Sequence, residues 1–207
     1  TLMRLAPQFP LLSDIAARMQ PSSALIDAID RCIDERAEVR DNASPELARA
    51  RRAVRVAYDR LHDRLQRLMT SSQVAPYLQE ALITQRGGRY VVPLRAECKG
   101  RVKGIIHDQS ASGATVFVEP LVTVDLNNKW REAQLVEEQE LQKVLADLSA
   151  LVADEAGAIR WTVEALAELD LAFAKAKYAD AIDATPPRLV PFARGDHPRG
   201  VVQLRQA

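Results

Sequence analysis

Apolar residues recur at steps of three and four positions over most of the chain, a spacing that is typical of amphipathic helices. Only one stretch, residues 79–120, departs from it clearly. Outside that stretch the pattern predicts helices over residues 23–38, 44–78, 121–156 and about 159–182. An apolar segment at residues 9–15 precedes them. The chain is therefore expected to be mainly α-helical.

The helix boundaries follow from local chemistry. Ser44-Pro45-Glu46 predicts a helix start, because serine caps the free backbone N–H groups, proline fits the first turn and glutamate favours the positive end of the helix dipole. The helix after residue 121 is expected to be capped at Thr123 or Asp125. Gly157 is expected to break or kink the path before the last helix.

Residues 79–120 instead contain short runs rich in β-branched residues, separated by turn signals. The runs are 81–84, 89–94, 101–107 and 114–118. Gly87-Gly88 supplies the positive φ angles that a tight hairpin needs. This stretch predicts a small antiparallel sheet inserted between two long helices.

The two long helices carry opposite charge. Arginines crowd the outer face of residues 49–67, whereas the helix from 121 is mostly acidic. The economical arrangement is a long antiparallel helical arm with the sheet at its far end and complementary charges beside the apolar seam. Because each exposed pair contributes only about 0.2–1 kcal/mol, apolar burial must hold the arm together.

Charge gives the best functional signal within the sheet. The 207 residues carry no net charge, but residues 79–107 contain six basic side chains against Glu80 and Glu97. The six are predicted to contact a nucleic-acid backbone: Arg86, Arg89, Arg95, Lys99, Arg101 and Lys103. The alternative is a charged, solvated surface. Tyr90 and Phe117 are interpreted as core residues rather than base-stacking platforms.

Strand alternation places Arg89, Val91 and Pro93 on one face, opposite Tyr90, Val92 and Leu94. Arg101, Lys103 and Ile105 would share a face of another strand. If these faces coincide, the cations coat a common outer surface.

No catalytic site is predicted. His107, Asp108 and Glu119 match no known metal-ligand spacing, and Ser110 and Ser112 near His107 lack the glycine pattern of an esterase elbow. No phosphate-binding GxxxxGK[ST] motif occurs. Cys32 and Cys98 are interpreted as free thiols of a cytoplasmic protein that does not enter a membrane. Starting at Thr1, the chain is interpreted as an excised fragment.

Several segments together resemble the second bacterial MutS family, the MutS paralogue that lacks the mismatch-reading domain and usually ends in a small MutS-related nuclease domain. They are RDNASP at 40–45, LITQR at 82–86, GRYVVP at 88–93, GIIHDQSASGAT at 104–115, FVEP at 117–120, LNN at 126–128 and EE at 137–138. Their number and order make the resemblance specific over about residues 40–140.

The resemblance implies a domain layout of core, lever and clamp. Residues 1–43 would be the N-terminal helical part of the core, 44–78 the ascending lever helix and 79–120 the β-rich clamp. Residues 121–156 would be the descending lever helix, 157–185 a C-terminal core helix and 186–207 a linker towards the ATPase domain. The family's motif next to the nucleotide would place His197 there, although residues 196–200 keep only its His-Pro pair.

The resemblance also implies a function. The parent would be a homodimer that uses ATP and magnesium to close its clamps on branched DNA and suppress homologous recombination. This segment itself would hold no cofactor, no metal and no catalytic residue. Two alternatives remain open: an arm that helps to split collided ribosomes, and a purely mechanical or dimerising arm without nucleic-acid contact.

Overall fold

A computed structural model describes residues 2–185. Its elements are α1 (Pro10–Ala17), α2 (Ser23–Cys32), α3 (Pro45–Met69), β1 (Thr84–Arg86), β2 (Arg89–Arg95), β3 (Gly104–Gln109), β4 (Thr115–Pro120), α4 (Leu121–Asp154) and α5 (Ala156–Ala181), with 3-10 turns at Leu2–Leu5, Ala75–Tyr77 and Ala96–Cys98. The predicted class, mainly α with a small antiparallel sheet, is confirmed. The described chain forms two compact units, residues 21–157 and the remainder.

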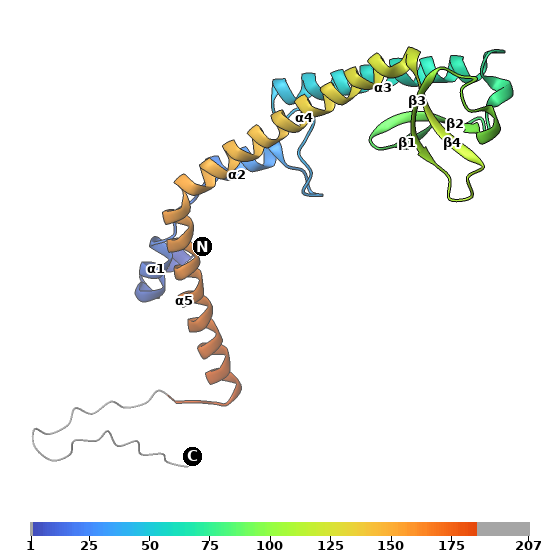
Figure 1. The fold of residues 1–207 in the computed structure, drawn as a ribbon. Coiled ribbons are helices and arrows are strands. Elements are labelled where there is room, and N and C mark those ends of the chain that lie inside the picture. Colours follow the sequence, from blue (N-terminus) through green and yellow to red (C-terminus); the bar gives the residue numbers. More distant parts are fainter. Residues whose placement is uncertain (1, 186–207) are drawn as a thin grey trace, which may run out of the picture. The chain divides into compact units, whose positions relative to one another are not determined.

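Helices α3 and α4 pack against each other in opposite directions, with the sheet where α3 ends and α4 begins (Figure 1). At one end Leu47 of α3 packs with Val144 and Leu148 of α4 and with α2. At the other end Leu61 and Leu65 pack with Trp130 and the sheet. All these side chains are at least nine-tenths buried, so apolar contacts hold the pair together.

Ser44 caps α3 as predicted, because its Oγ accepts a hydrogen bond of 3.0 Å from the Leu47 N–H and Pro45 follows in the first turn. Charge pairing along the seam is sparser than expected. Among the described residues, Arg51 and Glu137 form the one ion pair between α3 and α4, with Nε and Oε1 3.3 Å apart. The other described ion pairs of these helices are Arg49 with Glu46 and Lys143 with Glu140, each within one helix, and Arg51 with Asp41 of the turn before α3.

The sheet has the order β1-β2-β4-β3 and is antiparallel throughout. Gly87 and Gly88 form the predicted tight turn, with φ angles of 56° and 74°. The predicted alternation of β2 is confirmed, since Tyr90, Val92 and Leu94 face the helices and their core. Arg89 therefore lies on the opposite face of the sheet.

Several predicted boundaries were wrong. Helix α2 ends at Cys32, because Asp34 accepts hydrogen bonds from the N–H groups of Arg36 and Glu38 and Ala37 adopts a φ of 62°, which makes a turn. Helix α3 ends at Met69 rather than near residue 78. Helix α4 starts at Leu121, so neither Thr123 nor Asp125 caps it.

Two strands were also displaced from their predicted positions. β1 covers Thr84–Arg86 instead of 81–84, and β3 begins only at Gly104. Gly104 lies so close to β4 that a Cβ there would be 2.5 Å from Val118 Cγ1. Arg101 and Lys103 consequently lie in the loop before β3, not in the strand predicted over 101–107.

The unit formed by α1 and α5 is small. Arg18 forms an ion pair with Glu168, and this guanidinium holds the pKa of Glu168 below its usual range. The Gln20 N–H donates to Thr162 Oγ1 at 3.2 Å. Gly157 lies in the first turn of α5, and the helical path is interrupted just before it, at Glu155.

Candidate nucleic-acid interface

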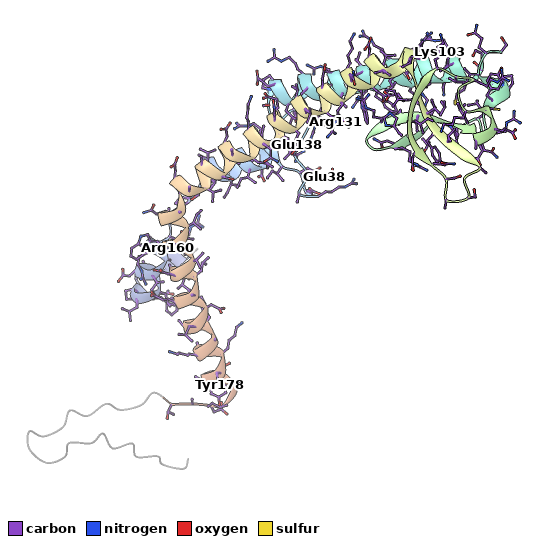
Figure 2. The ribbon with its side chains drawn as sticks, viewed as in Figure 1. Glu38, Lys103, Arg131, Glu138, Arg160 and Tyr178 are labelled. Atoms are coloured by element: carbon purple, nitrogen blue, oxygen red, sulfur yellow. The ribbon has the colours of Figure 1, made fainter. Side chains whose placement is uncertain are left out.

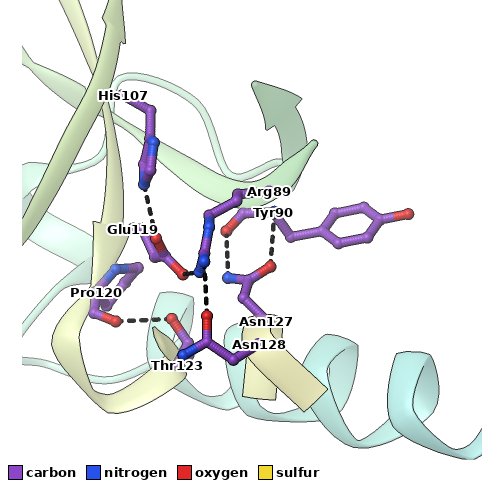
Figure 3. Close-up of polar contacts among 8 residues, drawn as sticks. All are labelled: Arg89, Tyr90, His107, Glu119, Pro120, Thr123, Asn127 and Asn128. Carbon is purple, nitrogen blue, oxygen red and sulfur yellow. Dashed lines mark hydrogen bonds and ion pairs between the residues drawn. The ribbon is translucent and has the colours of Figure 1, made fainter. Parts of the chain in front are cut away.

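The outer face of the sheet carries a buried carboxylate, Glu119 of β4, whose side chain is fully inaccessible to solvent. One oxygen accepts from Arg89 Nη1 at 2.8 Å, and the other lies 2.6 Å from His107 Nε2 (Figure 3). The same arginine donates from Nη2 to Asn128 Oδ1 at 2.6 Å. Glu119 thus joins three strands, and Arg89 ties them to helix α4.

A second set of hydrogen bonds fixes β2 to α4. The Asn127 side chain accepts from the Tyr90 N–H at 2.9 Å and donates to the Tyr90 carbonyl at 3.1 Å (Figure 3). Thr123 Oγ1 donates to the Pro120 carbonyl at 2.8 Å. Asn127 and Asn128 were not among the predicted site residues, although the LNN segment at 126–128 was part of the family resemblance.

His107 reaches Glu119 because the β3–β4 register shifts between Ile106 and Asp108. Such a bulge places one extra residue in a strand and redirects its side chain. No group of three or more histidine, cysteine, aspartate or glutamate side chains within residues 2–185 could hold a metal ion. Ser110 and Ser112 bond to each other and to the backbone of the β3–β4 turn.

Arg86 and Arg95, two of the six predicted contacts, also have partners within the sheet region. The Arg86 guanidinium lies 4.1 Å from the centre of the Phe117 ring and pairs with Asp108 at 3.1 Å. Arg95 donates to the Pro76 carbonyl. Together with Arg89, these arginines are engaged in holding the fold, which the sequence pattern did not reveal.

The other three predicted residues behave differently. Lys99, Arg101 and Lys103 are exposed, and none has a side-chain partner among the described residues. They lie on the loop from Ala96 to Lys103, in which Gly100 has a left-handed φ of 86°. Figure 2 shows Lys103 next to the start of α4, where the sheet meets the helix pair. The free basic charge of this region is therefore concentrated on one loop.

Tyr90 belongs to the core, as predicted. Its ring contacts Trp130 and Tyr58, with centroids 4.8 and 5.5 Å away. Burial, and then Tyr58, raises the pKa of the Tyr90 phenol. The ring is therefore not available to stack on a base.

The RDNASP segment at 40–45 has a structural role. Arg51 of α3 donates to the Val39 carbonyl at 2.9 Å and to Asp41 Oδ1 at 2.5 Å, besides its pair with Glu137. Arg40 Nε donates to the Asp30 carbonyl at 3.1 Å. These contacts fasten the turn after α2 to the helix pair.

His197, predicted to lie near a nucleotide, falls outside the described residues. Within residues 2–185, no helix has both the length and the apolar content that crossing a membrane requires. Cys32 and Cys98 are both free thiols.

Comparison with known proteins gives a consistent result. No family model matches the chain. It is 43% identical, over 90% of its length, to a protein of Agathobacter rectalis named Endonuclease MutS2, and 40% identical, over 97%, to one from a Geobacillus species with the same name. A third Endonuclease MutS2, from Thermomicrobium roseum, is 43% identical over 99% of the chain. The chain spans only about a quarter of the length of these curated relatives, 24–26%.

Proposed function

Because the chain belongs to the MutS2 family, we propose that its helix pair and sheet are the lever and clamp with which a MutS-like ATPase grips nucleic acid. The lever is α3 with α4, and the clamp is the sheet region at residues 79–120. The cargo is branched DNA, held by a homodimer that restrains homologous recombination. ATP and magnesium would act in the whole protein, and this segment would contribute binding rather than catalysis.

One observation carries the proposal: Lys99, Arg101 and Lys103 are exposed cations on one loop of the sheet, and none has a side-chain partner in the part of the chain that the structure describes. Such side chains neutralise phosphates and supply affinity that does not depend on base sequence. Their position next to the start of α4 means that a movement of the lever would carry the loop with it.

The contacts inside the fold favour these three among the six predicted residues. The guanidinium of Arg89 already has two partners, Glu119 and Asn128. Arg86 is paired with Asp108, and Arg95 donates to the Pro76 carbonyl. A phosphate would have to displace these partners, at the cost of breaking contacts that fix the sheet. We therefore assign the backbone contacts to the loop.

The test is a salt titration of the chain against a fluorescent four-way DNA junction. Each neutralised phosphate contributes a slope of about −0.9 to log K against log salt, so replacing Lys99, Arg101 and Lys103 with glutamine should make the slope about 2.7 shallower. The matched control replaces three other exposed cations, Lys129, Arg131 and Arg160, and should keep the wild-type slope.

Failure of the wild-type chain to bind the junction in low salt would refute a clamp and favour a mechanical or dimerising arm. A double-stranded RNA of equal length forms the second arm of the titration. Tighter binding to RNA than to the junction would contradict branched DNA as the cargo and point to the ribosome.

A further inference from the structure

A second basic surface lies on helix α3, apart from the clamp loop. It consists of five exposed arginines: Arg52, Arg55, Arg60, Arg64 and Arg67. None of their side chains has a hydrogen-bond or ion-pair partner among the described residues. Arg49 and Arg51 of the same helix, by contrast, pair with Glu46 and Glu137. We name these five residues the arginine face.

Helix geometry shows how the five are arranged around α3. A residue turns roughly 100° around the helix axis from the one before it. On that wheel Arg52, Arg60 and Arg67 lie opposite the buried Leu47, Leu61 and Leu65. Arg55 and Arg64 lie at the two edges of this outer half. The arginine face therefore points away from the apolar core. At about 1.5 Å per residue, it extends over about 22 Å.

Folding does not account for this charge. Arg60 and Arg64 are four residues apart, and Arg64 and Arg67 three apart, so these like charges oppose helix formation. Asp59, four residues after Arg55, and Asp63, four before Arg67, offset part of this repulsion. Asp59 and Asp63 lie among them, yet neither forms an ion pair with any of the five within the described residues. Within the described residues the five guanidinium groups are unpaired and outnumber the two carboxylates, so an excess of positive charge on α3 is available to a partner.

The chemistry of the face favours phosphate. All five residues are arginines, whose planar guanidinium binds phosphate oxygens with two parallel hydrogen bonds. A duplex carries one charge per about 1.7 Å of its axis, so 22 Å of helix would lie beside on the order of a dozen phosphates.

The acidic helix of a second copy is the other occupant to consider. The exposed side of α4 is mainly acidic but not uniformly so, because Lys129, Arg131 and Lys143 stand among its carboxylates. Arginines laid along it would therefore face some positive side chains. A phosphodiester backbone is uniformly negative and fits better.

We propose that the arginine face is a second binding surface for the nucleic-acid backbone, along which the strand held by the clamp loop continues beside α3. This inference rests on the proposed clamp function and adds a contact region outside residues 79–120. It gives the lever helix a direct role in binding.

The test replaces Arg52, Arg60 and Arg67 with glutamine and repeats the salt titration with a DNA junction and with a double-stranded RNA. Three lost phosphate contacts should make the slope of log K against log salt about 2.7 shallower and reduce affinity at low salt. This effect is expected with the nucleic acid that the wild-type chain binds more tightly. The Lys129/Arg131/Arg160 variant removes the same charge from other surfaces and should keep the wild-type slope. Unchanged circular dichroism and melting temperature would establish that the arginine variant is folded.

The outcomes separate the two proposals. If the salt dependence of binding becomes shallower in the clamp-loop variant and the arginine-face variant matches the control, the clamp proposal stands and the second surface is refuted. If the wild-type chain binds neither nucleic acid, both are refuted. If the arginine-face variant instead loses self-association in analytical ultracentrifugation and keeps its slope, the face binds a second copy and the inference is wrong.

Discussion

Replacing Arg89 with methionine is the most direct test of how the sheet is held on the helix pair. The substitution keeps an apolar stem of similar length and removes the guanidinium. The Glu119 carboxylate, fully buried, would then keep only His107 as a partner, and Asn128 would lose its donor.

The expected loss in the free energy of unfolding follows from the burial of the Glu119 carboxylate. Removing one partner of a buried ion pair costs about 3–5 kcal/mol, because the remaining charge is left without compensation in a poorly solvated place. The Arg89 side chain is 31% exposed, so water can partly replace it, and the lower end of that range, about 3 kcal/mol, is expected. For a urea dependence of about 1–3 kcal/mol per molar, the urea concentration at the unfolding midpoint should fall by about 1–3 M.

Urea unfolding followed by circular dichroism measures this loss. The control is Arg49→Gln, which breaks the exposed pair with Glu46 and should cost no more than about 1 kcal/mol. Adding Glu119→Gln to Arg89→Met removes the unpaired charge and should recover part of the stability. An Arg89→Met loss as small as that of Arg49→Gln would refute the reasoning, and Arg89 would again be a candidate for phosphate contact.

Two further predictions concern the sheet and its packing on α3. Gly104→Ala should destabilise the protein by about 1–3 kcal/mol in thermal unfolding, because the new methyl group would overlap the Glu119 carbonyl and Val118. Gly157→Ala is the control: the residue has open space around it in α5, so the change should be neutral or stabilise by up to about 1 kcal/mol. Equal effects of the two substitutions would contradict the close contact between Gly104 and β4. The raised pKa of Tyr90 means that its neutral form is favoured in the folded state. Its contribution to the free energy of unfolding is therefore complete below about pH 10 and is lost as the pH rises further. Tyr90→Phe should flatten that alkaline decline in unfolding free energy, and Tyr178→Phe, at an exposed tyrosine of α5, should leave it unchanged; a decline that persists in Tyr90→Phe would refute the assignment.

Local patterns were sufficient to predict the elements themselves. The three- and four-residue apolar spacing gave α3 and α4, Ser44-Pro45 gave the start of α3, and Gly87-Gly88 gave the hairpin turn. These features depend on neighbours within one or two turns of the chain, so propensity and periodicity determine them. Boundaries were less predictable, because Gly104 starts β3 through its close approach to Val118 of a different strand.

The sequence by itself therefore determined a helical protein with a basic sheet inserted between two long helices. Only the tertiary structure decided which of the basic residues are free. Arg89 meets Glu119 and Asn128, which are 30 and 39 positions away, through strand register and the placement of α4. A cation's partner depends on which distant residues share its face, and charge counts along the chain do not contain that information. Lys99, Arg101 and Lys103 are exposed, and within residues 2–185 no carboxylate forms an ion pair with any of them.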